Sequence, residues 1–551
     1  MALKIFMVLI SVSFFFWANI IPGGKGNIVQ FILKLFTLFI SFLSGTVLFT
    51  QTARFQEMLG ERFVKKIIII LLLIGPIYFL AISFLLHGSS SNYVVSPALD
   101  PISYFIQAKI FAATHINVPS HELKDFFTTG YCINDGKYYS MYFPGWPLLL
   151  SIGVALGLPW IINPIFGVLT LIIIYFTGKE IYDSTTGLFA AVLLMVSNNY
   201  YLLTPEYMSE PSSLFFSSLF FYLMVKTLKN PNILTSSLAG ISLGIIFLIR
   251  PFSAVAIALP VMGYSFFSSI KKRRKNMIHF AIIILTFLPI FCVFFLYNYF
   301  QTGSIFLTPT EYYNPHNILG FGLRSSDAIL KAHIYTLFEA LKNLSINLAL
   351  LNWESVLFLF IILLPVLINK KNKWDVILFA TVSTIIFLYI FYHFRSIRYY
   401  YVSYFALFLL AARGINLVEV LIKNFFPDAS IKNLNCFLLL FILVANIFII
   451  SPPQHAIKRY ELYQRLRDPF IMVREKNLKN SVVFLKSVPE PYNNISYYVQ
   501  NPLDFSGDVL FARDLKEKNI ELMNYYPEKE FYYYDYYFKS KSGKLSKINK
   551  N

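Results

Sequence analysis

The chain has 551 residues, of which 56% are hydrophobic and only 14% are charged, with a formal net charge of +18. Soluble proteins carry about a quarter charged residues, so this composition excludes an ordinary soluble enzyme. Apolar runs of about twenty residues recur along most of the chain, and each is long enough to cross the hydrocarbon core of a bilayer. The sequence therefore predicts a mainly α polytopic membrane protein. We assign its excess of Lys and Arg to cytoplasmic loops rather than to nucleic-acid binding.

The N-terminal segment combines Lys4 with an apolar run, a pattern shared with signal peptides. No small-residue cleavage site ends this run, and Pro22-Gly23-Gly24 is typical of a turn between helices, so we interpret the segment as a membrane anchor. Thirteen transmembrane helices are predicted in chain order, at residues 3–21, 29–50, 67–87, 160–177, 185–199, 211–228, 234–249, 252–269, 277–299, 354–369, 375–393, 399–416 and 434–451.

Clusters of Lys and Arg set the orientation, because they mark the cytoplasmic side. The strongest clusters are Lys271–Lys275, Lys370–Lys373, and Arg62 with Lys65 and Lys66. With thirteen helices, the N-terminus lies inside and the C-terminus outside. Residues 143–157 are apolar but short, and the charge rule would fail if they crossed the membrane. We therefore expect an interfacial or re-entrant helix on the outer face.

This orientation leaves large regions on the outer side, namely residues 88–159, 200–210, 300–353 and everything beyond about 452. Large outer loops are expected of a protein whose external active site is covered by them, rather than of a simple pore. The predicted domains are transmembrane helices at 1–64, a transmembrane module at 65–451, a small extracytoplasmic α/β domain at 452–540 and a disordered tail at 541–551.

The C-terminal region changes to charged and aromatic residues after Pro453. Residues 481–485, 509–512 and 530–534 read as strands, and residues 519–524 follow a helical pattern. About a hundred residues suffice for a small α/β domain. We expect this domain to cap the outer face or to handle an acceptor. The tail beyond Ser540 is rich in Lys and Ser, a composition typical of disorder.

Asp100 is the most informative polar residue, because it opens a segment that follows the first block of apolar helices. The stretch Ile102–Ala112 after Pro101 suits an amphipathic helix lying in the outer interface. An Asp before Pro is a favoured helix N-cap, which explains the residue without chemistry. Alternatively, a carboxylate at this depth acts as the base that deprotonates an acceptor hydroxyl. Tyr104, one turn along, would then lie on the same face.

Glu210 repeats this pattern, because it precedes Pro211 at another outer helix start. A helix cap explains it equally, but two acid–proline pairs in separate outer loops favour a shared site. Arg250 interrupts an apolar hairpin, where an arginine costs about 2.5–3.5 kcal/mol at mid-membrane. Either it snorkels to the headgroups, or it binds a protein carboxylate or a ligand phosphate.

Three more cations are predicted on the outer side, against the usual charge bias. Arg395 and Arg398 end a span, and Lys137 stands among aromatic residues. Phosphate binding and headgroup contact both explain them. His115, His121 and His316 lack the pair spacing of metal ligands, and the three cysteines are scattered. We therefore predict no metal site, no cofactor and no disulfide framework.

The order of these motifs resembles a known family. Asp100 in a first outer loop is followed by Gly-Lys-Tyr-Tyr-Ser-x-Tyr-x-Pro-Gly-x-Pro at 136–147, an acid–proline loop, Gly-x-x-x-Gly-x-x-x-Leu-x-Arg-Pro at 240–251 and a late Arg-Tyr-Tyr at 398–400. Over residues 65–415 this order resembles the GT-C glycosyltransferases, in particular the bacterial protein O-mannosyltransferase-like and aminoarabinose-transferase-like branch. Two departures are Pro101 directly after the acid, where many members have a second acid, and two additional N-terminal helices.

The resemblance implies an inverting hexosyl or pentosyl transferase of the bacterial cytoplasmic membrane. A polyprenyl-phosphate sugar would be the donor, and a lipid, glycan or protein the acceptor, bound among membrane lipids at the outer face. Asp100 matches the family's catalytic aspartate, Glu210 its second-loop acid and Arg250 its later basic residue. Asp100 is then the predicted base, and Tyr104, Lys137, Glu210, Arg250, Arg395 and Arg398 bind substrate. The rival interpretations are a lipid-linked-sugar flippase or secondary transporter, and a non-catalytic assembly scaffold.

Overall fold

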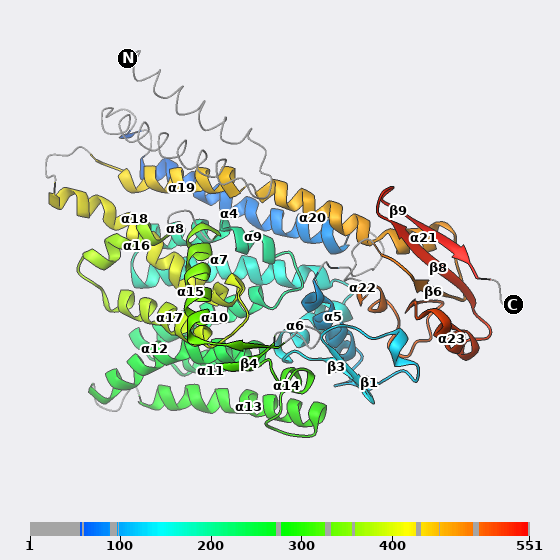
Figure 1. Ribbon diagram of the computed structural model, residues 1–551. Helices are drawn as coiled ribbons and strands as arrows, with labels where there is room; N and C mark the ends of the chain where they lie inside the picture. The colour runs from blue at the N-terminus through cyan, green and yellow to red at the C-terminus, as the bar shows by residue number, and fades with distance from the viewer. Residues whose placement is uncertain are drawn as a thin grey trace, which may run out of the picture.

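The computed structural model describes residues 56–57, 60–88, 96, 98–271, 277–325, 332–354, 359–425, 431–450, 452–488 and 495–548. Helices dominate it (Figure 1). The long or strongly apolar ones are α4 (Glu61–Ser83), α7 (Ile162–Ile181), α8 (Ser184–Met195), α10 (Glu210–Lys229), α11 (Ile233–Ile249), α12 (Pro251–Lys271), α13 (Met277–Thr302), α16 (Leu359–Ile368), α17 (Lys373–Ile390), α18 (Tyr404–Phe425) and α19 (Leu434–Ile450). The others are α5 (Leu99–Ala112), α6 (Gly145–Ala155), α9 (Asn198–Leu203), α14 (Pro309–Tyr313), α15 (Leu337–Glu354), α20 (Pro452–Leu466), α21 (Asp468–Glu475), α22 (Ile495–Tyr498) and α23 (Asn519–Tyr525).

Seven of the described helices are long and apolar enough to cross a membrane, and five shorter apolar helices accompany them. The predicted spans at 3–21 and 29–50 lie outside the described residues, as does almost all of the predicted N-terminal unit at 1–64. Each remaining predicted span falls on a described helix. The mainly α polytopic fold of a multi-pass membrane protein is therefore confirmed, whereas the number and direction of the crossings stay predictions.

Helix α10 lies inside the bundle, packed against α7, α11, α12 and α18. Most of its residues are buried, including four serines. Ser217 and Ser218 donate hydrogen bonds to the carbonyls of Ser213 and Leu214 one turn earlier (2.6 and 2.7 Å). Their hydroxyls are thereby satisfied within the helix. Small side chains also let neighbouring helices approach closely, so α10 is a rigid support for Glu210 at its first position.

Helix α6 presses against the junction between α11 and α12. A Cβ added at Gly145 would lie 2.6 Å from the backbone nitrogen of Ile249 and 2.6 Å from the carbonyl carbon of Leu248. Only glycine fits this close approach. The Pro-Gly motif of residues 136–147 is thereby held beside Arg250, which interrupts the helix with an extended backbone (φ −149°). At about 1.5 Å rise per residue, α6 is about half the length needed to cross the bilayer core.

Helix α5 corrects the interfacial-helix prediction for residues 102–112. It is buried on nearly all sides rather than laid on a surface. The small antiparallel sheet of β1 (Val118–Pro119), β3 (Lys137–Ser140) and β2 (Cys132–Asp135) packs beside it. Ser103 donates to the carbonyl of Tyr131 (2.6 Å) and Gln107 to that of Ile116 (2.9 Å). Ser103 and Gln107 of α5 therefore bind the loop that follows this helix instead of lipid headgroups.

The C-terminal region forms a four-stranded sheet in the order β7 (Val509–Arg513), β6 (Ser481–Leu485), β8 (Glu530–Tyr537) and β9 (Ser542–Lys547). The first three strands are parallel, and α23 connects β7 to β8. The predicted strands and helix of a small α/β region are thus confirmed. The predicted disordered tail from 541 is wrong, because β9 pairs with β8 along its whole length and buries Leu545.

This C-terminal sheet shares a core with the loop that follows α5, the first of the loops predicted on the outer side. Phe126 and Phe127, within and after the short turn η2 (Lys124–Phe126), are buried among Val482, Leu510 and Phe531 of the sheet. Lys109 of α5 donates to the carbonyls of Val499 and Asn501, each at 2.8 Å. Figure 1 shows the sheet at the same end of the helical bundle as α5, β1 and β3. The C-terminal sheet and the loop that carries Asp100 therefore form one packed unit.

Helix α20 is attached to the bundle by a buried acid. Glu206 is 5% exposed, and its carboxylate binds Arg459 (2.9 Å) and accepts from the hydroxyl of Tyr463 (2.7 Å), both on α20. His87, at the end of α4, lies 3.5 Å from the same carboxylate. Burial opposes ionisation of Glu206. The charge of Arg459 and the polar contacts with His87 and Tyr463 together outweigh this effect and lower the pKa of Glu206 to about 2.

Glu206→Gln is expected to lower the unfolding midpoint at neutral pH, because an amide cannot balance the charge of Arg459. The folded pKa of about 2 lies below the ordinary value of 4.5. The ion pair thus contributes fully above pH 4.5, and its contribution is lost as the pH falls toward 2. Thermal unfolding of the two proteins should differ by a constant amount above pH 4.5 and by less below it. Glu530→Gln, which breaks an exposed pair with Lys547, is the control with little expected effect. A midpoint difference that does not change with pH would contradict the assignment.

Candidate active site

A cavity of about 300 Å³ opens where the loops predicted on the outer side meet the bundle. Six segments form it: the start of α5, the loop before α6, the start of α10, the α11–α12 junction, residues 308–319 in and around α14, and residues 389–399 at and after the end of α17. Its polar lining consists of Asp100, Tyr104, Tyr131, Tyr142, Ser209, Glu210, Arg250, Thr308, Thr310, Glu311, Asn317, Tyr389, Tyr392, Arg398 and Tyr399.

Asp100 faces this cavity and is not a helix cap. Helix α5 begins at Leu99, its cap position is Ala98, and no side chain caps it. The carboxylate of Asp100 instead accepts a hydrogen bond from the hydroxyl of Tyr142 and lies 3.7 Å from Nη1 of Arg398. Burial, and then the charge of Asp100, hold the pKa of the Tyr142 hydroxyl well above its usual value. Tyr142 therefore remains a donor that orients the carboxylate.

Glu210 and Arg250 form a buried ion pair beside Asp100. Nη2 of Arg250 lies 2.8 Å from Oε1 of Glu210, and the same guanidinium donates to Ser209 Oγ (2.9 Å). Glu210 is the first residue of α10 and makes no capping bond, so the cap explanation is wrong for this acid too. The snorkelling alternative for Arg250 is also wrong, because its guanidinium binds a protein carboxylate rather than the headgroup region.

Arg398 is the cation left available to a ligand. It sits in the short segment η4 (Ile397–Ser403), where its own amide is held by Ser396 Oγ (3.3 Å). Its guanidinium is 3.7 Å from Asp100 and 3.9 Å from Glu210, both longer than a hydrogen bond. Within the described residues, this guanidinium donates no hydrogen bond to an oxygen, and its one hydrogen bond goes to the sulfur of Met208 (3.9 Å). Its donors are therefore free to turn toward an anion in the cavity.

The other predicted residues separate into two groups. Tyr104 lines the cavity, and its hydroxyl lies 3.2 Å from Ser209 Oγ. Lys137 lies outside the cavity lining, exposed on β3, and donates to the carbonyl of Phe300 (3.0 Å). Arg395 is likewise exposed and outside the lining. The structure thus joins Asp100, Tyr104, Glu210, Arg250 and Arg398 in one place, and does not bring Lys137 or Arg395 there.

Several lining residues were not predicted. Tyr142 stands inside the Tyr-x-Pro-Gly motif. This motif could have indicated Tyr142, because the motif follows Asp100 closely in sequence and precedes a buried helix start. Tyr389 and Tyr399 stack with ring centroids 5.1 Å apart, and Glu311 closes a capping box with Thr308 at the start of α14. No sequence pattern distinguished Tyr389 and Tyr399 from the rest of the chain's 37 tyrosines, or Glu311 from the remaining acids. Among the described residues, no group of three or more His, Cys, Asp or Glu side chains is placed to hold a metal ion.

The chain shows partial similarity to solved structures. ArnT from Cupriavidus metallidurans bound to undecaprenyl phosphate is similar over 84% of this chain and 88% of that chain, with a TM-score of 0.49 and 9% identity. The oligosaccharyltransferase of Archaeoglobus fulgidus tethered with an acceptor peptide is similar over 81% of this chain and 61% of that chain, with a TM-score of 0.41 and 14% identity. Arabinosyltransferase EmbB from Mycobacterium smegmatis is similar over 83% of this chain and 46% of that chain, with a TM-score of 0.40 and 12% identity. TM-scores below 0.5 describe a partial likeness of fold, and nothing about chemistry follows from them.

Sequence similarity is confined to one segment. No curated protein matches the chain significantly. Residues 153–297 match the family described as dolichyl-phosphate-mannose-protein mannosyltransferase. This segment runs from α6 to α13 and contains Glu210 and Arg250. Over residues 153–297 the chain is thus similar to the protein mannosyltransferases, and for this segment the predicted resemblance to these enzymes is confirmed.

Proposed function

We propose that this protein is a membrane glycosyltransferase that moves a sugar from a polyprenyl-phosphate donor to an acceptor at the outer face of the cytoplasmic membrane. The observation that carries the proposal is the convergence of Asp100 and Arg398 on one cavity, 3.7 Å apart and on segments distant in sequence. A transferase of this kind needs a base beside a cation that binds phosphate. The family similarity of residues 153–297 supports the same chemistry.

The proposed reaction is a single displacement with inversion at the anomeric carbon. Asp100 accepts the proton of the acceptor hydroxyl while the acceptor oxygen forms a bond to the anomeric carbon. The bond between that carbon and the phosphate oxygen breaks, and the polyprenyl phosphate leaves with the electron pair. Arg398 stabilises the charge that develops on the leaving oxygen. Tyr142 holds the carboxylate of Asp100 toward the acceptor.

Glu210 and Arg250 have a different proposed role. Their mutual ion pair leaves Arg250 little capacity to bind a second anion. Glu210 in turn faces Arg398 at 3.9 Å, so it positions that guanidinium without satisfying its donors. We therefore assign phosphate binding to Arg398 and positioning to the Glu210–Arg250 pair. Tyr104 extends this support through Ser209.

Arg398→Gln is expected to raise the donor KM or lower kcat/KM about 10- to 100-fold, because the loss of one hydrogen-bonded charge costs about 1.5–3 kcal/mol. Steady-state kinetics with a polyprenyl-phosphate sugar measure this effect. Arg395→Gln removes the same charge three residues away but outside the cavity, and should stay within about twofold of wild type. Equal effects of the two substitutions would contradict the assignment of Arg398.

The purified protein tests the proposed activity directly. In detergent with a polyprenyl-phosphate sugar and a membrane extract as acceptor source, it should release polyprenyl phosphate and transfer the labelled sugar. Sealed vesicles containing the protein distinguish the transporter interpretation. Movement of the intact lipid-linked sugar across the bilayer, without any cleavage of the sugar–phosphate bond, would overturn the proposed function.

A further inference from the structure

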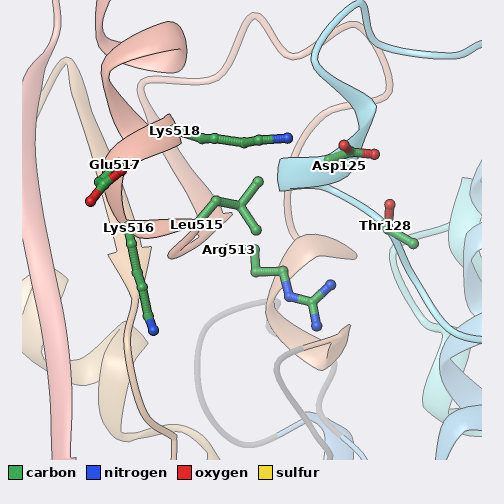
Figure 2. A pocket seen from close by; sticks show the side chains of 7 residues that line it. All are labelled: Asp125, Thr128, Arg513, Leu515, Lys516, Glu517 and Lys518. Atoms are coloured by element: carbon green, nitrogen blue, oxygen red, sulfur yellow. The ribbon is translucent and has the colours of Figure 1, made fainter.

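A second pocket lies between the first outer loop and the C-terminal sheet, away from the cavity of Asp100. Its volume is about 750 Å³, within the usual range for ligand sites. One wall carries Asp125 and Thr128 beside the turn η2, and the other is the loop that follows β7, from Arg513 to Lys518. Figure 2 shows Arg513 and Lys518 extending from their loop toward the opposite wall, whereas Glu517 points away.

Both walls are held in place by neighbouring structure. Asp125 and Thr128 flank Phe126 and Phe127, whose rings are buried in the core of the C-terminal sheet. The hydroxyl of Thr128 donates to the carbonyl of Lys124 (3.0 Å), which fixes the turn. This wall is therefore anchored to the domain that carries the opposite wall.

The loop after β7 is folded by its own hydrogen bonds. Asp514 accepts from the amide of Lys516 (3.1 Å) and from the side chain of Asn519 (2.6 Å). Asn519 also accepts from the amide of Leu515 (2.9 Å), and Lys516 has a left-handed backbone (φ 58°). Asp514 is thus engaged by the backbone of Lys516 and the side chain of Asn519, and the loop presents its basic side chains from a defined conformation.

The charges in this pocket are unbalanced. Among the described residues, Arg513, Lys516 and Lys518 form no ion pair with a carboxylate within 4 Å. Lys124 on the opposite wall is already paired with Asp135 at 2.7 Å. These three cations outnumber the two carboxylates of the lining, Asp125 and Glu517, and Glu517 points away from the opposite wall (Figure 2), so the pocket favours an anion. Asp125 and Thr128 add a carboxylate and a hydroxyl, groups that bind sugar hydroxyls by accepting and donating hydrogen bonds.

We infer that this pocket binds an acidic saccharide, a sugar chain with carboxylate or phosphate groups. Arg513 and Lys518 would bind the acidic groups, and Asp125 and Thr128 the ring hydroxyls. The first outer loop continues from this wall to Tyr131 and Tyr142, which line the cavity of Asp100. The pocket therefore suits a distal part of the acceptor. That role rests on the proposed function, whereas saccharide binding at the pocket does not.

Binding to the purified full-length protein tests the inference. Three probes are titrated at low ionic strength, where charge interactions are least screened: tetragalacturonate, mannopentaose phosphate and neutral mannopentaose. At least one acidic probe should bind saturably and at least tenfold more tightly than mannopentaose, and the stronger of the two acidic probes identifies carboxylate or phosphate as the recognised group. Arg513→Gln/Lys518→Gln should weaken acidic binding at least tenfold and leave the unfolding midpoint unchanged.

Matched variants make the outcome decisive. Lys539→Gln/Lys544→Gln removes two exposed charges elsewhere on the same sheet and should bind as wild type does. Absence of saturable binding, equal binding of mannopentaose, or equal weakening by the two double variants would each overturn the inference. Asp100→Asn should bind the acidic probes normally. If wild type binds them yet transfers no sugar from any polyprenyl-phosphate donor, the proposed function fails and the saccharide site stands.

Discussion

Asp100→Asn is expected to reduce sugar transfer about 10²- to 10⁴-fold, the usual contribution of a general base. The asparagine oxygen can still accept the hydrogen bond of Tyr142, and the side chain keeps its shape. An amide, however, cannot take a proton from the acceptor hydroxyl. Initial rates of transfer with saturating donor measure the loss, and the effect should fall on kcat more than on the donor KM.

Two controls separate chemistry from folding in this experiment. The unfolding midpoint and the binding of polyprenyl phosphate should stay close to wild type in Asp100→Asn, because Arg398 remains in place. Asp135→Asn removes an exposed carboxylate from the segment that follows α5, where its ion-pair partner among the described residues is Lys124, and should retain nearly full activity. Substantial sugar transfer by Asp100→Asn would contradict the assignment of Asp100 as the base, whatever the behaviour of the other variants.

The central residues of the site were predictable because they are chemically out of place. Asp100, Glu210, Arg250 and Arg398 interrupt or flank apolar segments, where a charge without a partner is costly. Such residues therefore need one another or a ligand, and the structure brings all four to one cavity. The same reasoning could not assign the partners. It left Arg250 open to headgroups, a protein carboxylate or a ligand phosphate, and only the structure shows that the guanidinium binds the carboxylate of Glu210 and the hydroxyl of Ser209.

Failures of prediction share a physical cause, since each depended on contacts between distant segments. Lys137 and Arg395 have the same local signal as Arg398, but only tertiary packing decides which of them points into the cavity. An acid before proline is a good cap by propensity. Here, however, α5 begins two residues and α10 one residue earlier than that pattern assumes, and neither acid makes a capping bond. The Lys- and Ser-rich end of the chain has a disordered composition, but the edge of β8 offers it a full ladder of backbone hydrogen bonds.

The Glu210–Arg250 pair should have the largest effect on stability. Arg250→Gln removes the hydrogen-bonded counter-ion of the Glu210 carboxylate, which is only 1% exposed, and leaves it only the more distant Arg398 at 3.9 Å. Breaking a buried pair in this way typically costs about 3–5 kcal/mol. Glu210→Gln should also be destabilising, because the guanidinium then loses its charge partner. Oε2 of Glu210 has no hydrogen-bond partner among the described residues, so the ion pair is the main compensation for this buried charge.

A double-mutant cycle distinguishes this pairing from two independent losses. Arg250→Gln/Glu210→Gln restores neutrality, so its destabilisation should be smaller than the sum of the single effects by about 1 kcal/mol or more. Reversible chemical unfolding in detergent measures the three differences from wild type. The cycle Arg395→Gln/Glu210→Gln serves as the control, because exposed Arg395 makes no contact with the acid and its effect should be additive. Additivity in the Arg250 cycle would mean that the pair does not stabilise the site, and Arg250 would then have capacity to bind the donor phosphate beside Arg398.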